Sequence, residues 1–161
     1  MALSKIPSAG FQDNVKFRNI IINGDMSIAQ RGTSFTGITA TQYTLDRQRA
    51  GITTAGTWTI SQSTDVPSGQ GFGYSLKYDC TTADASLGAG DYVILNQNIE
   101  GQYLQYLKKG TSSAESLTCS FWVRSNKTGT YICEIADNDN TRQISRSYTI
   151  NSADTWEKKT L

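Results

Sequence analysis

The stretch "SLTCSFWVRSNKTGTYICEI", residues 116–135, carries the clearest fold signal in the chain. Apolar and polar residues alternate on both sides of the polar segment "SNKTG", and a period of two is typical of strands with one buried face. Turn-forming residues between two such runs predict an antiparallel hairpin. We expect the core-facing residues of the two arms to be Leu117, Cys119, Phe121 and Val123 opposite Tyr131, Cys133 and Ile135.

Segments of the same kind lie on both sides of this predicted hairpin. Most combine β-branched and aromatic residues with flanking turn residues, which favours strands. One of them, "FRNIIIN" (17–23), is an apolar run too short for a helix and predicts a buried strand. The pattern predicts an all-β protein, an antiparallel jelly-roll β-sandwich over residues 18–161, with further strands at 57–63, 73–80, 91–99, 144–150 and 156–161.

Charge and composition exclude several classes of function. The formal net charge is +1 and the basic residues form no cluster, so no nucleic-acid partner is expected. No apolar run approaches the 18 residues of a membrane span, so none is expected. The chain has no histidine, which removes the usual Ser-His-Asp and Cys-His catalytic arrangements. No spacing selects a pair of carboxylates either, and we therefore expect no enzyme activity and no cofactor.

The three cysteines, Cys80, Cys119 and Cys133, each fall in an alternating apolar register. An odd number without Cys-x-x-Cys spacing fits neither a disulfide framework nor a zinc site. We expect buried free thiols that behave as small hydrophobic groups, which suits folding in a reducing cytoplasm. A Cys119–Cys133 bridge between neighbouring strands remains an alternative.

The segment "DNDN" (137–140) places oxygen-bearing side chains close together, as a calcium loop does. It lacks the glycine at the sixth position and the distant glutamate of an EF-hand. We expect a hairpin turn here, with calcium binding as the minority interpretation, and we predict no metal site.

The segment "GQYLQYLKKG" (101–110) breaks the β pattern. Its tyrosines and leucines form a helical stripe between two glycines, which predicts a short helix or helical turn at one end of the sandwich. Such a stripe is more often core than ligand platform. If the chain instead binds a glycan, exposed aromatic side chains flanked by amides and acids would form the site, and the candidates are Tyr103, Tyr106 and Trp122.

Residues 1–17, "MALSKIPSAGFQDNVKF", are a separate zone without strand or helix periodicity. Their apolar side chains are too scattered to form a core, which favours burial in a partner. We predict an extended attachment arm that uses Leu3, Ile6, Phe11 and Val15. At the other end, "TWEKKTL" resembles the beginning of a strand, and we expect the chain to be the N-terminal portion of a longer polypeptide.

The stretches "NIIINGDMSIAQRGTSF" (19–35) and "YTLDRQRA" (43–50) together carry a family resemblance. An apolar run, Asn-Gly-Asp, Gln-Arg-Gly and then Tyr-x-x-Asp-Arg resembles the opening of bacteriophage tail-fibre and related virion appendage proteins. Gln48 stands where that pattern has tryptophan. The leader "MALSKI" is similar to the N-termini of such fibres, and "LTCSFWVRSNKTGTYICEIAD" with "YTINSADTWEKKTL" resembles the jelly-roll scaffold of carbohydrate-binding modules.

The resemblance implies a virion structural protein, a tail fibre that acts in host attachment. It implies a homotrimer docked by its N-terminus to a tail adaptor, a nozzle or the capsid, with virion localisation and with a host glycan as a further partner. A capsid-associated fibre or knob, or a glycan-binding module, is the alternative. From the residues themselves, Asn23-Gly24 predicts a turn, and Gln30, Arg31, Asp46 and Arg47 are polar groups expected to tie the following loop to the sheet through an Arg–carboxylate pair.

Overall fold

The computed structural model describes residues 19–137 and 139–161, and the predicted arm at 1–17 lies outside the described residues. The described residues are all-β, with 41% in strands and 4% in helical turns, and their strands pair antiparallel in several sheets, none of them a closed barrel. The described chain contains β1 Ser34–Ile38, β2 Gln42–Tyr43, β3 Arg49–Thr53, β4 Thr57–Ser63, β5 Ser75–Thr82, β6 Tyr92–Asn96, η1 Gly101–Tyr103, η2 Gln105–Leu107, β7 Ser120–Val123, β8 Gly129–Asp137, β9 Arg142–Ile150 and β10 Glu157–Thr160.

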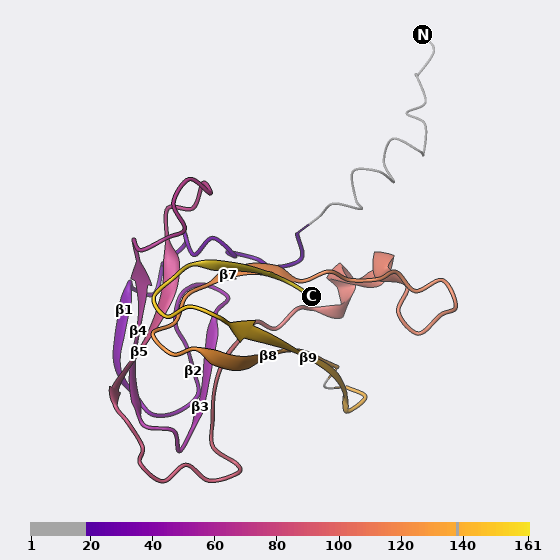
Figure 1. Cartoon of the computed structure of the whole chain (residues 1–161). Coiled ribbons are helices and arrows are strands. Elements are labelled where there is room, and N and C mark those ends of the chain that lie inside the picture. Colours follow the sequence, from indigo (N-terminus) through magenta and orange to yellow (C-terminus); the bar gives the residue numbers. More distant parts are fainter. Residues whose placement is uncertain (1–18, 138) are drawn as a thin grey trace. The chain divides into compact units, whose positions relative to one another are not determined.

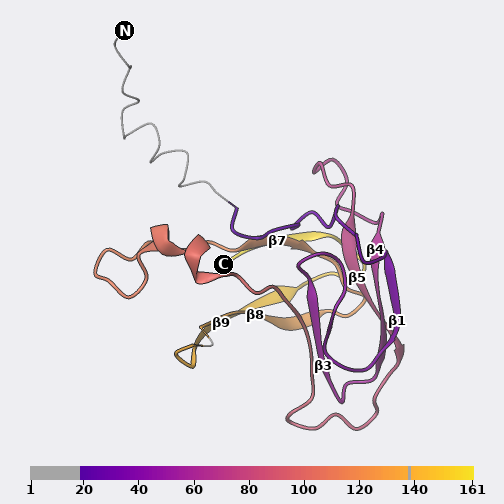
Figure 2. The same cartoon turned by 180° about the vertical axis from the view of Figure 1, so that it is seen from behind.

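The chain divides into two compact units. Of the described residues, 19–64 and Gly73–Tyr106 form unit 1. Asp65–Phe72 and Leu107–Leu161 form unit 2, so the connection between β4 and β5 is assigned to the second unit. Figures 1 and 2 show the strands of each unit from opposite sides.

Unit 1 contains two three-stranded sheets, ordered β1-β4-β5 and β2-β3-β6. Buried side chains from both sheets join in one cluster, with Ile38 from β1, Ile60 from β4, and Ala50 and Ile52 from β3. At Gly56 the chain turns tightly into β4 with a φ of 83°, and a Cβ there would collide with the Thr82 carbonyl oxygen. Only glycine fits such a backbone conformation and approach.

Unit 2 contains two two-stranded sheets, β7–β10 and β8–β9. The predicted hairpin at 116–135 is therefore wrong, because Phe121 in β7 pairs with Lys159 in β10, and Tyr131 in β8 pairs with Tyr148 in β9. The predicted inner face is largely preserved, however, since the two sheets face each other: the rings of Phe121 and Tyr148 meet edge to face at 5.1 Å. In both views β7 runs alongside the β8–β9 ribbon (Figures 1 and 2).

The segment between β7 and β8 is a corner between sheets. Arg124 lies at this corner and forms ion pairs with Asp65 and, at 3.5 Å, with Asp154. Tyr131 closes the far side of the corner by donating its hydroxyl to the Lys127 carbonyl oxygen at 3.0 Å. A corner and a hairpin both keep alternate side chains on one buried face, so a period of two does not distinguish them.

Three core predictions for unit 2 and its neighbours require correction. Leu117 and Ile135 are 39% and 49% exposed, so neither is a core residue. Cys80 is exposed near the end of β5. Cys119 and Cys133 are free thiols and are half-buried, where buried thiols were expected. Phe121 is also half-buried.

The predicted strand at 17–23 is also wrong where it is described. Ile21 and Ile22 are 44% and 42% exposed in a turn, and the buried residue is Asn23. The predicted turn is confirmed: Asn23 has a φ of 55°, and its carbonyl accepts a hydrogen bond from the Met26 amide at 3.1 Å. Asparagine tolerates this left-handed conformation because its side chain bonds the local backbone.

Candidate functional site

Polar residues from the stretches 19–35 and 43–50 form one network that attaches segment 19–31 to the rest of unit 1. Asn23 is its centre. The Asn23 Nδ2 donates to the carbonyl oxygens of Ile28 and Asp46, both at 2.9 Å, and its Oδ1 accepts from the Ile28 amide at 2.9 Å. A buried side-chain amide with three backbone partners fixes the turn, since each lost bond would leave a buried polar group unsatisfied.

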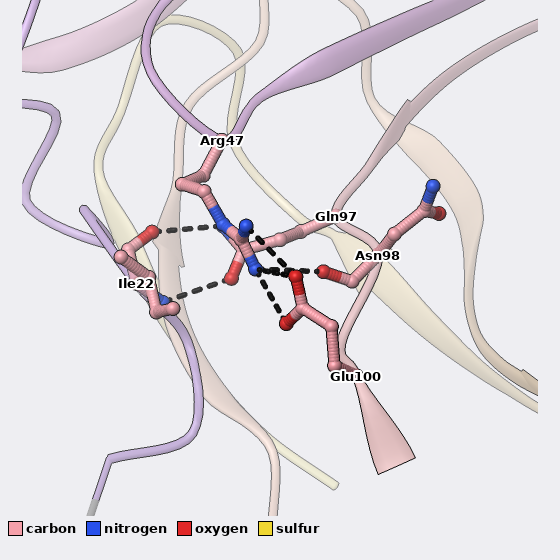
Figure 3. Close-up of polar contacts among 5 residues, drawn as sticks. All are labelled: Ile22, Arg47, Gln97, Asn98 and Glu100. Carbon is pink, nitrogen blue, oxygen red and sulfur yellow. Dashed lines mark hydrogen bonds and ion pairs between the residues drawn. The ribbon is translucent and has the colours of Figure 1, made fainter. Parts of the chain in front are cut away.

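Two glutamines attach the same segment from the opposite side. The Gln97 side chain donates to the Ile22 carbonyl and accepts from the Ile22 amide, both at 2.8 Å, as a neighbouring strand would (Figure 3). Gln48 is 3% exposed and its Nε2 lies 3.4 Å from the Asn23 carbonyl oxygen. Gln48, which replaces the tryptophan of the family pattern, therefore acts here as a buried hydrogen-bond donor.

An ion pair lies beside this attachment. The Arg47 guanidinium contacts both oxygens of the Glu100 carboxylate, with Nη2 at 2.8 and 3.0 Å, and donates to the Asn98 carbonyl at 3.3 Å (Figure 3). The hydrogen bonds from Arg47 hold the pKa of Glu100 below its ordinary value, and Glu100 raises the pKa of Arg47. The pair is largely exposed, so its role is mainly to orient the chain after β6.

The sequence prediction for these polar residues is confirmed in part. Asp46 accepts a hydrogen bond from the Gln30 amide at 2.7 Å, so the loop after β2 is tied to the segment before β1. The Arg31 guanidinium lies over the Tyr43 ring, 5.2 Å from its centroid. The arginine–carboxylate pair does form, but with Glu100, which the sequence reasoning missed because it lies 53 positions from Arg47.

Unit 1 also contains a partly open pocket of about 240 Å³. Trp58 and Tyr92 supply aromatic walls, Leu87 an aliphatic one, and Asp84 and Asp91 carboxylates. Each carboxylate accepts one backbone hydrogen bond in its own turn, Asp84 from Ser86 and Asp91 from Gly88. The second oxygen of each carboxylate has no hydrogen-bond partner among the described contacts, so this pocket combines aromatic surface with acceptors.

The structure does not assemble the three aromatic residues predicted from sequence. The helical turn at 101–110 is confirmed as η1 and η2, which place Tyr103 46% exposed and Tyr106 half-buried in unit 1. Trp122 belongs to β7 in unit 2, opposite Lys158. No ring contact joins any two of these three side chains in the described part of the chain.

Two nearby side chains hold the Asp137 carboxylate at the end of β8. The Asn140 Nδ2 and the Arg142 guanidinium both donate to Asp137 Oδ2, at 2.8 and 3.1 Å, and together they lower the pKa of Asp137. Within residues 19–137 and 139–161, no group of three or more Cys, Asp or Glu side chains is placed to hold a metal ion. The expected hairpin turn is confirmed, because this segment joins the antiparallel strands β8 and β9.

No protein-family model matches the sequence, and neither the curated proteins nor the solved structures yielded a significant match. Among the helices that the structure describes, none has the length and apolar character needed to cross a membrane.

Proposed function

We propose that the chain is a bacteriophage virion structural protein, most simply a tail fibre whose N-terminal part docks to the virion. One observation carries the proposal: the motif residues that resemble tail fibres bond to one another and to unit 1 through Asn23, Asp46 and Gln48. These residues perform a structural task, attachment of the segment that follows the arm, which is the task expected at the base of a fibre.

The proposed docking uses the arm at 1–17, with Leu3, Ile6, Phe11 and Val15 buried in a tail adaptor, a nozzle or the capsid. A rigid attachment at 19–31 suits this role, because force on a docked arm would pass directly into unit 1. The proposal includes a homotrimer and a jelly-roll arrangement of the sheets. A capsid-associated fibre or knob would use the same attachment at a different virion position.

The test is mass spectrometry of purified virions of the phage that encodes the chain. We expect its peptides in the virions at stoichiometric abundance. The proposal would be rejected if infected cells make the protein but the virions purified from those cells lack it. Deletion of residues 1–17 should abolish incorporation while leaving unit 1 folded. Normal occupancy of the truncated protein would instead assign the contact to the described body.

A matched pair of variants tests the attachment itself. Gln97→Ala removes both hydrogen bonds to Ile22, whereas Asn98→Ala leaves the Asn98 carbonyl bond to Arg47 in place. We expect Gln97→Ala to lower virion occupancy and Asn98→Ala to leave it unchanged. If the two variants have equal occupancy, the hydrogen bonds that hold segment 19–31 are not needed for docking.

A second proposed function is glycan binding, favoured by the pocket between Trp58 and Tyr92. Sugar rings have an apolar face that stacks on aromatic side chains and hydroxyl groups that donate to carboxylates, and this pocket offers both. Its acceptors would be the outward oxygens of Asp84 and Asp91. The site differs from the Tyr103, Tyr106 and Trp122 set proposed from sequence.

Two equally exposed tyrosines provide the control for this second function. Tyr92 is 45% exposed at the pocket, and Tyr103 is 46% exposed outside it. On a glycan array, Tyr92→Ala should lose binding that Tyr103→Ala retains. The reverse result would return the site to the helical turn, and the absence of any bound glycan on the wild-type protein would remove the function.

A further inference from the structure

The thiols of Cys119 and Cys133 meet between the two sheets of unit 2. Their sulfur atoms are 3.9 Å apart, and both cysteines are half-buried. The two residues are in different sheets, since Cys119 pairs with Leu161 beyond the end of β10, and Cys133 pairs with Arg146 in β9. A covalent bond here would therefore join the two sheets.

We propose that Cys119 and Cys133 are a disulfide site that closes under oxidising conditions and staples the two sheets of unit 2 together. A disulfide bond is about 2.05 Å long, so the sulfurs must approach by roughly 1.9 Å, within the reach of small side-chain and sheet adjustments. Strand pairing holds the backbone of each cysteine in place. The stacked rings of Tyr131 and Tyr148, with centroids 5.8 Å apart, join β8 and β9 next to Cys133.

The oxidant is a low-molecular-weight disulfide. One cysteine thiolate attacks it, which forms a mixed disulfide and releases one thiolate; the second cysteine thiolate then attacks the protein sulfur and releases the other. Two protein thiols lose two protons and two electrons, and the small disulfide is reduced to two thiols. Burial, together with the neighbouring Cys119, raises the pKa of the Cys133 thiol to about 11, so closure should accelerate as the pH rises from 7 toward 9.

The staple addresses a physical weakness of this unit. Two-stranded sheets are marginal by themselves, and the two sheets of unit 2 are joined along the chain only by the corner and turns. A link across a loop of this length constrains the unfolded chain. The biological setting rests on the proposed function: a protein that folds reduced in the host cell and then enters an oxidising medium would acquire the bond after release.

The experiment uses the whole chain with Cys80→Ser, which removes the exposed third thiol and leaves Cys119 and Cys133 unchanged. The reduced protein is incubated with oxidised glutathione at pH 7 and pH 9, then digested without reduction. We expect a mass loss of about 2 Da and one peptide pair that joins Cys119 to Cys133. We also expect a Tm increase of roughly 5–10 °C that dithiothreitol reverses.

Three results would overturn the proposal. They are stable mixed glutathione adducts on both cysteines, dimers linked between chains, or an internal bond that leaves Tm unchanged. Cys119→Ser in the same background serves as the control and should show neither the linked pair nor the Tm increase. Because the chemistry is measured on purified protein, its failure is distinguishable from absence of the chain from virions.

Discussion

The two units solve the same packing problem with different numbers of strands. In unit 1, two three-stranded sheets enclose buried aliphatic side chains, among them Ile38, Ile52 and Ile60. In unit 2, two two-stranded sheets face each other, and the buried apolar side chains among its described residues are Pro67, Leu107 and Ile150. Both units have alternating strands, but among the described residues only unit 1 brings buried aliphatic side chains from two sheets together in one cluster.

The inner face of β10 shows the same difference. Glu157 and Lys159 pair with Val123 and Phe121 on β7 and therefore share their face. Their side chains are 16% and 13% exposed, and they form an ion pair at 2.6 Å. The inner face of a sheet in unit 2 thus carries an ion pair, whereas the inner faces in unit 1 carry isoleucines. We therefore expect the stability of unit 2 to depend more on polar contacts.

The largest expected effect is on the core of unit 1. Ile60 is fully buried, and Ile60→Ala should lower the free energy of unfolding by ~2–5 kcal/mol, as cavities in packed cores do. Denaturant unfolding measures the loss, and hydrogen exchange should rise in β1, β4 and β5. The same substitution at Ile132, which is 61% exposed in unit 2, should stay within ~0.5 kcal/mol. Equal losses would remove the distinction between the cores.

A smaller loss is expected at the centre of unit 2. Phe121 is only half-buried, although its ring packs on Tyr148 at 5.1 Å. Phe121→Ala should therefore lower the free energy of unfolding by about half of the ~3–5 kcal/mol of a fully buried phenylalanine. Thermal unfolding with near-ultraviolet dichroism follows both tyrosine packing and stability. A loss as large as that of Ile60→Ala would mean that unit 2 has an equally dense core.

Acid should weaken unit 2 through Glu157. The Lys159 ammonium, with backbone donors from Ser152 and Asn151, lowers the pKa of Glu157 from its ordinary 4.5 to about 2. A carboxyl group with a depressed folded pKa stabilises the fold above its ordinary pKa, and the contribution is lost as pH falls from 4.5 toward 2. Glu157→Gln should flatten this decline in Tm, whereas Glu134→Gln on the outer face of β8 should keep it. An unchanged acid profile for Glu157→Gln contradicts the assignment.

The smallest effect concerns a polar atom in the core of unit 1. The Tyr78 hydroxyl is buried and has no hydrogen-bond partner among residues 19–137 and 139–161, and burial raises the pKa of this phenol. Tyr78→Phe should therefore leave stability unchanged or raise it by up to about 1 kcal/mol, since it removes an unsatisfied group and keeps the ring against Trp58. Paired denaturant curves resolve a change of this size, and a clear loss of stability would show that the hydroxyl has a partner.

Local patterns in the sequence determined much of the strand content. The expected strand at 57–63 coincides with β4, and 130–137 and 144–150 fall within one residue or two of β8 and β9. The turn at Asn23 and the helical turns near Tyr103 were also predicted, because turn chemistry and residue spacing act over a few residues. Strands β1, β2 and β3 were missed, although Ala50 and Ile52 lie at the centre of the core; β3 is short and contains Gly51, and its local signal is weak.

Tertiary structure alone decided which strands pair and which groups meet. The alternation on either side of "SNKTG" fits a hairpin and a corner equally, and only the pairing of β7 with β10 and of β8 with β9 shows that the segment is a corner. The Gln97 bonds to Ile22 span 75 positions, and those of Arg47 to Glu100 span 53. Strand periodicity reports which face of a segment is buried, whereas the partner across the core or along the sheet depends on chain closure over long distances, which no local pattern encodes.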